Sequence, residues 1–202
     1  MDRNRSVQFF DEQFRRQIAA GDYALNPFEA AALPHLRSEV LDYGCGLGNL
    51  AVQASRRGCK VVALDASKTA IDHLRELASR EGLPLRAGVA DLRSFQLAEQ
   101  FDAVVCIGLL MFFDCPTALA QLSRLQAHVR PGGVAIVNVL VEGTTFMDMF
   151  STEGHCLFGR DQLRDQFAGW QLIGCEQQEF PAPGGTRKVF VTVIARKPDE
   201  DA

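Results

Sequence analysis

Short apolar runs alternate with segments of helical periodicity along the chain, and this alternation limits the possible folds more than any other feature. Near-continuous apolar runs are typical of parallel strands covered on both faces, and the helices between them connect one strand to the next. The pattern predicts an α/β fold with a single Rossmann-like, doubly wound, seven-stranded sheet that is mostly parallel. The expected strands are 39–43, 60–64, 85–89, 103–107, 134–140, 170–175 and 188–195.

The last two expected strands are separated by PAPGGT, a run of turn formers, so we expect them to form a C-terminal antiparallel hairpin. Glycines, prolines and capping residues mark the helix ends. Asn26 is the expected cap of a helix that Pro27 opens, and Ser67 caps another. The first expected helix ends before Gly21. The others run over 27–35, 49–57, 68–81, 116–129 and 160–167.

The chain is interpreted as one domain over residues 1–202, because no linker or internal repeat divides it. Within it we expect an N-terminal helical lid segment over 1–37 and a cofactor-binding core over 38–140. An acceptor-side segment with the hairpin would follow over 141–196, and a flexible charged tail over 197–202.

Charge and cysteine spacing restrict the partners. The net charge of −4, without a dense basic run, argues against nucleic acid. No apolar run is long enough to cross a membrane, and the polar start does not resemble a leader. The six cysteines show no C-x-x-C spacing, so we expect free, packed thiols, no metal site and a cytoplasmic location. Monomer and dimer both remain open.

A glycine-rich turn follows the first expected strand, in VLDYGCGLGNLA over 40–51. Gly44, Gly46 and Gly48 allow a tight turn and a close approach of backbone to ligand. A nicotinamide dinucleotide fold would have glycine where this chain has Asn49, and Asp42 would sit badly beside a pyrophosphate. A carboxylate at that position suits a ligand with an ammonium and a sulfonium, which disfavours the oxidoreductase alternative.

Together these residues resemble the first motif of class I S-adenosylmethionine-dependent methyltransferases. The second strand ends in Asp65, which can accept both hydroxyls of a ribose. The resemblance implies S-adenosyl-L-methionine as the cofactor, S-adenosyl-L-homocysteine as its product, and contacts from Asp91 to the adenine amino group. The full set of expected cofactor-binding residues is Asp42, Gly44, Cys45, Gly46, Gly48, Asp65, Ala66, Asp91, Leu92, Ile107 and Gly108.

More narrowly, the chain is similar to the tellurite-resistance methyltransferase family. The similarity lies in LLMFFD at 109–114, RPGGVAIV at 130–137, LFGRDQLRDQFAGWQLI at 157–173 and the closing VFVTVIARKP. It implies methyl transfer to a small-molecule nucleophile such as a chalcogen oxyanion, a thiol or another small metabolite. The family often has a His-Arg pair before its last strand; FPAPGGTRK has no histidine there, and Arg187 alone keeps the cationic position.

The methyl acceptor is expected to meet the N-terminal loop and the segments after the fourth and fifth strands. His155 is the candidate base, with Tyr23 and Arg187 as further catalytic candidates. Each has a plainer interpretation: a solvated loop histidine, a packing tyrosine and a strand-flanking arginine. Other candidates for this pocket are Asn26, Phe112, Asp114, Cys156 and Phe158.

Two rivals of another kind remain. A non-catalytic S-adenosylmethionine- or nucleotide-binding regulatory domain would keep the same cofactor motifs. An RNA or protein methyltransferase is disfavoured, because the first usually adds basic surface, and amino-methylating relatives often carry an Asn/Asp-Pro-Pro-Phe/Tyr run where this chain has IGLLMFFD.

Overall fold

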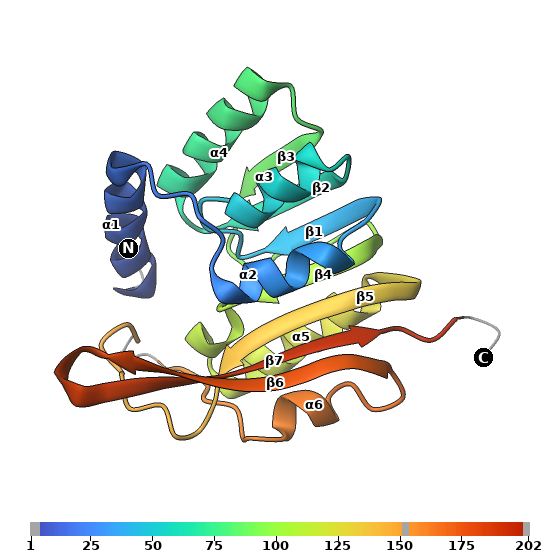
Figure 1. Cartoon of the computed structure of the whole chain (residues 1–202). Helices are drawn as coiled ribbons and strands as arrows, with labels where there is room; N and C mark the ends of the chain where they lie inside the picture. The colour runs from blue at the N-terminus through green and yellow to red at the C-terminus, as the bar shows by residue number, and fades with distance from the viewer. Residues whose placement is uncertain (1–4, 151–153, 200–202) are drawn as a thin grey trace.

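The computed structural model describes residues 5–150 and 154–199, and these contain one seven-stranded sheet with the strand order β3-β2-β1-β4-β5-β7-β6. The first five strands pair in parallel, and β7 runs antiparallel to both β5 and β6. The predicted mostly parallel sheet with a C-terminal hairpin is confirmed (Figure 1). The strands are β1 Glu39–Tyr43, β2 Lys60–Asp65, β3 Leu85–Val89, β4 Phe101–Ile107, β5 Val129–Leu140, β6 Gln171–Ala182 and β7 Thr186–Arg196.

Helices cover both faces of the sheet, as the apolar strands require. On one face, α2, α3 and α4 pack against the strands within one apolar cluster. This cluster includes Leu50, Ile71, Val40 and Val105. On the other face α5 and α6 pack against the sheet within a second apolar cluster. The helices are α1 Arg5–Ala20, α2 Pro27–Ala32, α3 Asn49–Arg56, α4 Lys68–Glu81, α5 Cys115–Ala127 and α6 Gln162–Asp165, with short 3-10 turns η1 Leu33–His35, η2 Leu110–Phe112 and η3 Pro183–Gly185.

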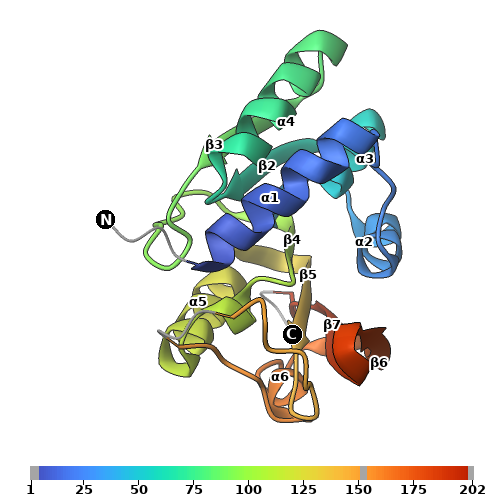
Figure 2. The same cartoon turned by 90° about the vertical axis from the view of Figure 1, so that its left-hand side faces the viewer.

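The N-terminal helix α1 lies across the carboxyl ends of the parallel strands (Figures 1 and 2). Phe14 lies directly over the glycine turn, because a Cβ added at Gly46 would be 3.1 Å from its ring. Ser67, at the start of α4, donates a hydrogen bond to Asp11 of α1. Helix α1 therefore closes one side of the region where ligands of such sheets bind.

Helix α2 begins with the predicted cap. The Asn26 side chain accepts hydrogen bonds from the backbone of Phe28 and Glu29, and the Glu29 carboxylate accepts one from the Asn26 backbone at 2.8 Å. This reciprocal capping box fixes where Glu29 lies. The helix itself ends at Ala32, and the remainder of the expected helix is the turn η1.

Several C-terminal elements differ from their predicted bounds, and β5 already begins at Val129 rather than at residue 134. Strand β6 continues through Pro181 and Ala182, so only residues 183–185 turn the hairpin rather than all of PAPGGT. Because β6 is the edge strand, the missing N–H of Pro181 interrupts no inner ladder. Helix α6 covers only Gln162–Asp165, and turns lead from it to Gly169.

The expectation of free thiols is wrong for Cys115 and Cys156, which form a disulfide. Cys115 begins α5, and the backbone N–H of Cys156 donates to the carbonyl of Met111 just before it. The chain returning from β5 thus brings two cysteines together across a separation of 41 residues. Spacing alone does not reveal such a pair, because it depends on the path of the intervening segment.

The ends of the chain limit what is described. Lys197, the first residue of the expected flexible tail, donates from Nζ to the carbonyl groups of Gln126 and Val129. Residues 200–202 of that tail and residues 1–4 of the expected lid lie outside the described residues. No helix within the described ranges is long and apolar enough to cross a membrane.

Gly48 is expected to be intolerant of a side chain. It is the N-cap residue of α3 with φ +74°, and an added Cβ would lie 2.5 Å from Cδ2 of the buried Leu74. We expect Gly48→Ala to lower the free energy of unfolding by about 2–4 kcal/mol, through backbone strain and overpacking.

Gly82→Ala is the matched control for this prediction. Gly82 has φ +62° with no atom within 4 Å of an added Cβ, so it reports the backbone strain alone, about 1 kcal/mol. Urea unfolding of both variants measures the difference. Equal losses would show that Leu74 yields without cost.

Candidate cofactor and acceptor site

The turn after β1 is held by the neighbouring strand β2. The backbone N–H groups of Gly44 and Cys45 both donate to the carbonyl of Leu64. Asp65, at the end of β2, accepts hydrogen bonds from the backbone of Gly46 and of Ser67, both at 2.8 Å. Burial raises the pKa of Asp65, and these backbone hydrogen bonds oppose the rise. The carboxylate of Asp65 therefore organises the glycine turn and remains at the cavity, where its oxygens can accept further hydrogen bonds.

Asp42 is a buried carboxyl group with an unsatisfied hydrogen-bond acceptor among the described residues. Its side chain is 5% exposed, and among the described residues its Oδ2 has no hydrogen-bond partner. Desolvation raises the pKa of Asp42 to about 8, and the nearby carboxyl groups of Glu29 and Asp65 add to the rise. A cation bound beside Asp42 would reverse the effect of these causes.

These groups line a cavity of about 630 Å³ at the carboxyl ends of the strands. Gly48 is an exception among the predicted cofactor residues: it does not line the cavity and packs on Leu74 instead. Asp91 lines it with an exposed side chain that also accepts a hydrogen bond from the backbone of Arg93. The predicted residues that line the cavity are Asp42, Gly44, Cys45, Gly46, Asp65, Ala66, Asp91, Leu92, Ile107 and Gly108.

None of the three predicted catalytic residues is among the described residues that line this cavity. Tyr23 stacks on His73 at a smaller surface depression, with ring centroids 5.2 Å apart. The exposed His155 stacks on Phe150. The side chain of Arg187 donates to the carbonyl of Gly143 and lies 3.5 Å from the Glu179 carboxylate.

The other candidates divide between the cavity and structural positions. Asn26 and Phe112 line the cavity. Asp114 caps α5 by accepting a hydrogen bond from the backbone of Thr117, which also holds the pKa of Asp114 below its usual value. Cys156 and Phe158 are fully buried, and the first is in the disulfide.

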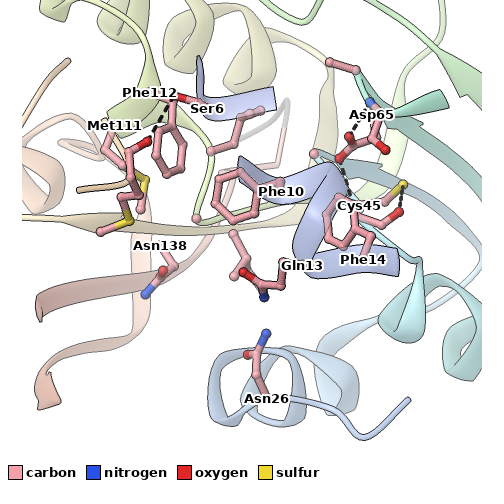
Figure 3. Close-up of a pocket in the computed structure, with 18 of the residues that line it drawn as sticks. Ser6, Phe10, Gln13, Phe14, Asn26, Cys45, Asp65, Met111, Phe112 and Asn138 are labelled. Carbon is pink, nitrogen blue, oxygen red and sulfur yellow. Dashed lines mark hydrogen bonds between the residues drawn. The ribbon is translucent and has the colours of Figure 1, made fainter. Parts of the chain in front are cut away.

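Several lining residues were not predicted. Phe10, Gln13 and Phe14 reach the cavity from α1, and Asn138 and Lys188 reach it from β5 and β7. Figure 3 shows Phe10 and Phe14 between Cys45 on one side and Asn138 on the other. The helical periodicity of the N-terminal aromatics was the available signal for α1. A sequence contains no such signal for Asn138 and Lys188, because the β5–β7 register brings them to this edge.

The residues present fit S-adenosylmethionine. Asp42 presents an unpartnered buried oxygen where a cationic ligand would compensate it. Asp65 lies at the end of the adjacent strand, where its carboxylate would accept hydrogen bonds from a ribose. The backbone of the turn that begins at Gly44 lines the same cavity and is accessible to the ligand. No group of three or more His, Cys, Asp or Glu side chains that could hold a metal ion occurs within residues 5–150 and 154–199.

The sheet order, the glycine turn and the carboxyl groups at the ends of β1 and β2 define a class I S-adenosylmethionine-dependent methyltransferase domain. Comparison with known proteins confirms this class. Residues 40–133 match a protein family described as "Methyltransferase domain". The predicted resemblance to the tellurite-resistance family is also confirmed by sequence similarity, and the solved structure of a member has the same fold.

Among individual proteins, the chain is 32% identical to Hemagglutinin 1 of Eikenella corrodens, over 79% of this chain and 55% of that protein. It is 25% identical to a probable S-adenosyl-L-methionine-dependent methyltransferase, TehB, of Haemophilus influenzae strain 10810, over 79% of this chain and 57% of the relative. The crystal structure of TehB from H. influenzae superposes with a TM-score of 0.76 and 19% identity, covering 90% of this chain and 65% of that one. The chain thus spans little more than half the length of these curated relatives.

Proposed function

We propose that this protein transfers the methyl group of S-adenosylmethionine to a small-molecule nucleophile, such as a thiol, a chalcogen oxyanion or another small metabolite. The observation that carries the proposal is the buried Asp42, which has an unpartnered oxygen and lines the same cavity as the glycine turn and Asp65. The family match over residues 40–133 supports the cofactor.

The chain's own residues would act mainly by binding and orienting. Asp42 would hold the positively charged part of the cofactor, and Asp65 its ribose, while Asp91 would lie at the adenine. When bound, S-adenosylmethionine supplies a methyl group on a sulfonium that needs no further activation. Helix α1, with Phe10 and Phe14 over the cavity, would exclude water from the reacting atoms, which is the role proposed for residues 1–37 as a lid.

The shape of the cavity favours an enzyme over a regulatory binding domain. A domain that only senses the cofactor needs no space beyond it. Here the cavity continues past Gly108 to Asn138, Lys188 and Phe190, which belong to strands farther along the sheet. This second end is where an acceptor would lie.

The direct test combines binding and label transfer. Calorimetry should detect S-adenosylmethionine and S-adenosylhomocysteine at micromolar concentrations or below, about 8 kcal/mol of binding free energy. Methyl-labelled S-adenosylmethionine is then incubated with thiol, chalcogen-oxyanion, carboxylate and amine acceptors. Binding of NADH without binding of S-adenosylmethionine would contradict the proposal. Cofactor binding without transfer to any acceptor would favour the regulatory domain.

Replacing Asp65 tests the ribose contact. We expect Asp65→Ala to weaken S-adenosylhomocysteine binding by about 1–3 kcal/mol, since the hydroxyl groups would lose their acceptor and the Gly46 turn its anchor. Calorimetric titration measures the change. Asp72→Ala is the control, because this exposed carboxylate on α4 pairs with Lys68 away from the cavity. Unchanged affinity in Asp65→Ala would limit Asp65 to a structural role.

A further inference from the structure

The cavity has a second end that differs in chemistry from the cofactor end. Its walls come from α1, from η2, from the end of β5 and the segment after it, and from the start of β7. Figure 3 shows Met111, Phe112 and Asn138 across the cavity from Asp65 and Cys45. We call this the acceptor end. Its apolar residues pack in one hydrophobic cluster: Phe9, Met111, Phe112, Leu140, Phe146, Met149 and Phe190.

One unpartnered polar atom lies at the acceptor end. Asn138 is 0% exposed, and its Nδ2 donates to Oγ1 of Thr192 at 2.8 Å. Its Oδ1 has no hydrogen-bond partner among the described residues. A buried amide oxygen without a partner costs free energy, so a ligand with a hydrogen-bond donor at this position would be stabilised.

One cation also lies there. Lys188 is half-buried, and its Nζ lies 4.7 Å from the centroid of the Phe146 ring. Burial lowers the pKa of Lys188, and within the described residues no carboxylate forms an ion pair with it. Among the described residues that line the cavity, Lys188 is the one ionisable side chain on β5, on β7 or on the segment between them, and the carboxylate of Glu29 lines the cavity from α2.

We propose that the acceptor is an apolar, preferably aromatic, molecule that carries one negatively charged soft nucleophile, such as a thiolate, held by Lys188. This inference rests on the proposed function and narrows its substrate class. The aromatic walls would bury the body of the acceptor, Lys188 would face its charge, and Asn138 would accept a hydrogen bond from a donor on it. A bare inorganic oxyanion would leave the aromatic walls without a partner and would find a single cation.

The charge of Lys188 also determines how the acceptor would be activated. A cation beside a thiol favours its thiolate form, so no separate base is needed at this end. A lone pair of the thiolate would form the new S–C bond as the bond between the methyl carbon and the sulfonium sulfur breaks. The electron pair of the broken bond would stay on the cofactor sulfur. The negative and positive charges cancel, and the products are a neutral thioether and S-adenosylhomocysteine. The acceptor's proton leaves to solvent before the transfer.

The first experiment measures acceptor-end binding without turnover. The complex of the full chain with S-adenosylhomocysteine is titrated in a calorimeter with 4-methylbenzoate, with the neutral 4-methylbenzamide and with selenite. We expect the benzoate to bind at least about tenfold tighter than the amide, and selenite to bind more weakly than either. Equal affinity for benzoate and amide, or tighter binding of selenite, would overturn the inference while leaving cofactor binding intact. Failure of S-adenosylhomocysteine to bind would instead contradict the proposed function.

The second experiment assigns the charge to Lys188. Lys188→Met should abolish the preference for the benzoate over the amide, and Lys188→Arg should retain it, because arginine keeps the charge. Arg187→Met tests the rival assignment one residue away, since Arg187 is directed to Gly143 and Glu179 instead. Loss of the preference in Arg187→Met but not in Lys188→Met would overturn the assignment.

The third measurement tests the nucleophile. Label from methyl-labelled S-adenosylmethionine should pass to 4-methylbenzenethiol in the wild type. In Lys188→Arg the transfer should persist, because arginine keeps the positive charge. If Lys188 acted instead as a neutral base, arginine could not replace it and the transfer would be lost. Loss of transfer in Lys188→Arg with anion binding retained would show that Lys188 removes a proton, and would overturn its role as the holder of an anion.

Discussion

Asp42→Asn should make the empty protein more stable at pH 8 and at the same time nearly abolish cofactor binding. The pKa of Asp42 is about 8 in the folded protein, against 3.8 for an ordinary aspartate. The raised pKa of Asp42 therefore contributes to the free energy of unfolding in full below pH 3.8, and this contribution is lost as the pH rises through about 8. Asparagine does not titrate, so the variant should gain on the order of 5 kcal/mol over the wild type by pH 8.

Cofactor binding should change in the opposite direction. A buried carboxylate that pairs with a cation leaves a large deficit when its charge is removed, about 3–5 kcal/mol or more than a hundredfold in affinity. In the wild type, affinity should rise between pH 6 and 8, because the empty site must release the Asp42 proton before it holds the cation. Calorimetry in buffers of different ionisation enthalpy measures that proton directly.

Urea unfolding at pH 5 and pH 8 completes the test of Asp42. Glu29→Gln is an informative comparison, since it removes a neighbouring carboxyl group that raises the pKa of Asp42 while leaving Asp42 in place. An Asp42→Asn variant that matches the wild type in both stability and affinity at pH 8 would show that Asp42 is an ordinary buried aspartate.

Cys115→Ala is expected to lower the free energy of unfolding by about 4 kcal/mol under oxidising conditions, the second largest effect we predict. The disulfide closes a loop with a sequence separation of 41, and the entropy that it removes from the unfolded chain grows with loop length. Reduction of the wild type should lower its stability to about that of the variant. Both are measured by urea unfolding with and without dithiothreitol.

The control for the disulfide is Cys175→Ala, which removes an exposed free thiol. It should leave the unfolding midpoint and its response to dithiothreitol unchanged. A wild-type midpoint that is insensitive to dithiothreitol would mean that the two cysteines contribute as packed thiols. Cysteines 115 and 156 would then match the expectation from the sequence.

The cofactor end was predictable because its signals are local. Each strand that leads to it is a short apolar run, and the residues at issue follow directly: the turn from Gly44, then Asp65, then Asp91. In a parallel sheet the carboxyl ends of neighbouring strands meet, so order along the chain is enough to bring these residues together. Gly48 fits the same pattern in sequence, yet its lack of a side chain serves packing against Leu74.

The acceptor end could not be predicted in the same way. Arg187 and Lys188 are adjacent cations in sequence, and the alternation of side chains along β7 sends one outward and the other to the cavity. A one-residue change in the register of β7 would exchange them. The positions of Tyr23 and His155 depend on how loops pack, which no local pattern specifies.

The place of β7 between β5 and β6 bears on how the protein is made. The strands that carry the cofactor residues are complete once Gly108 has been synthesised, whereas Lys188 and Phe190 leave the ribosome much later and must insert beside a β5 edge that waits for them. A nascent chain stalled before β7 would therefore have a nucleoside cleft but no chamber for a second reactant.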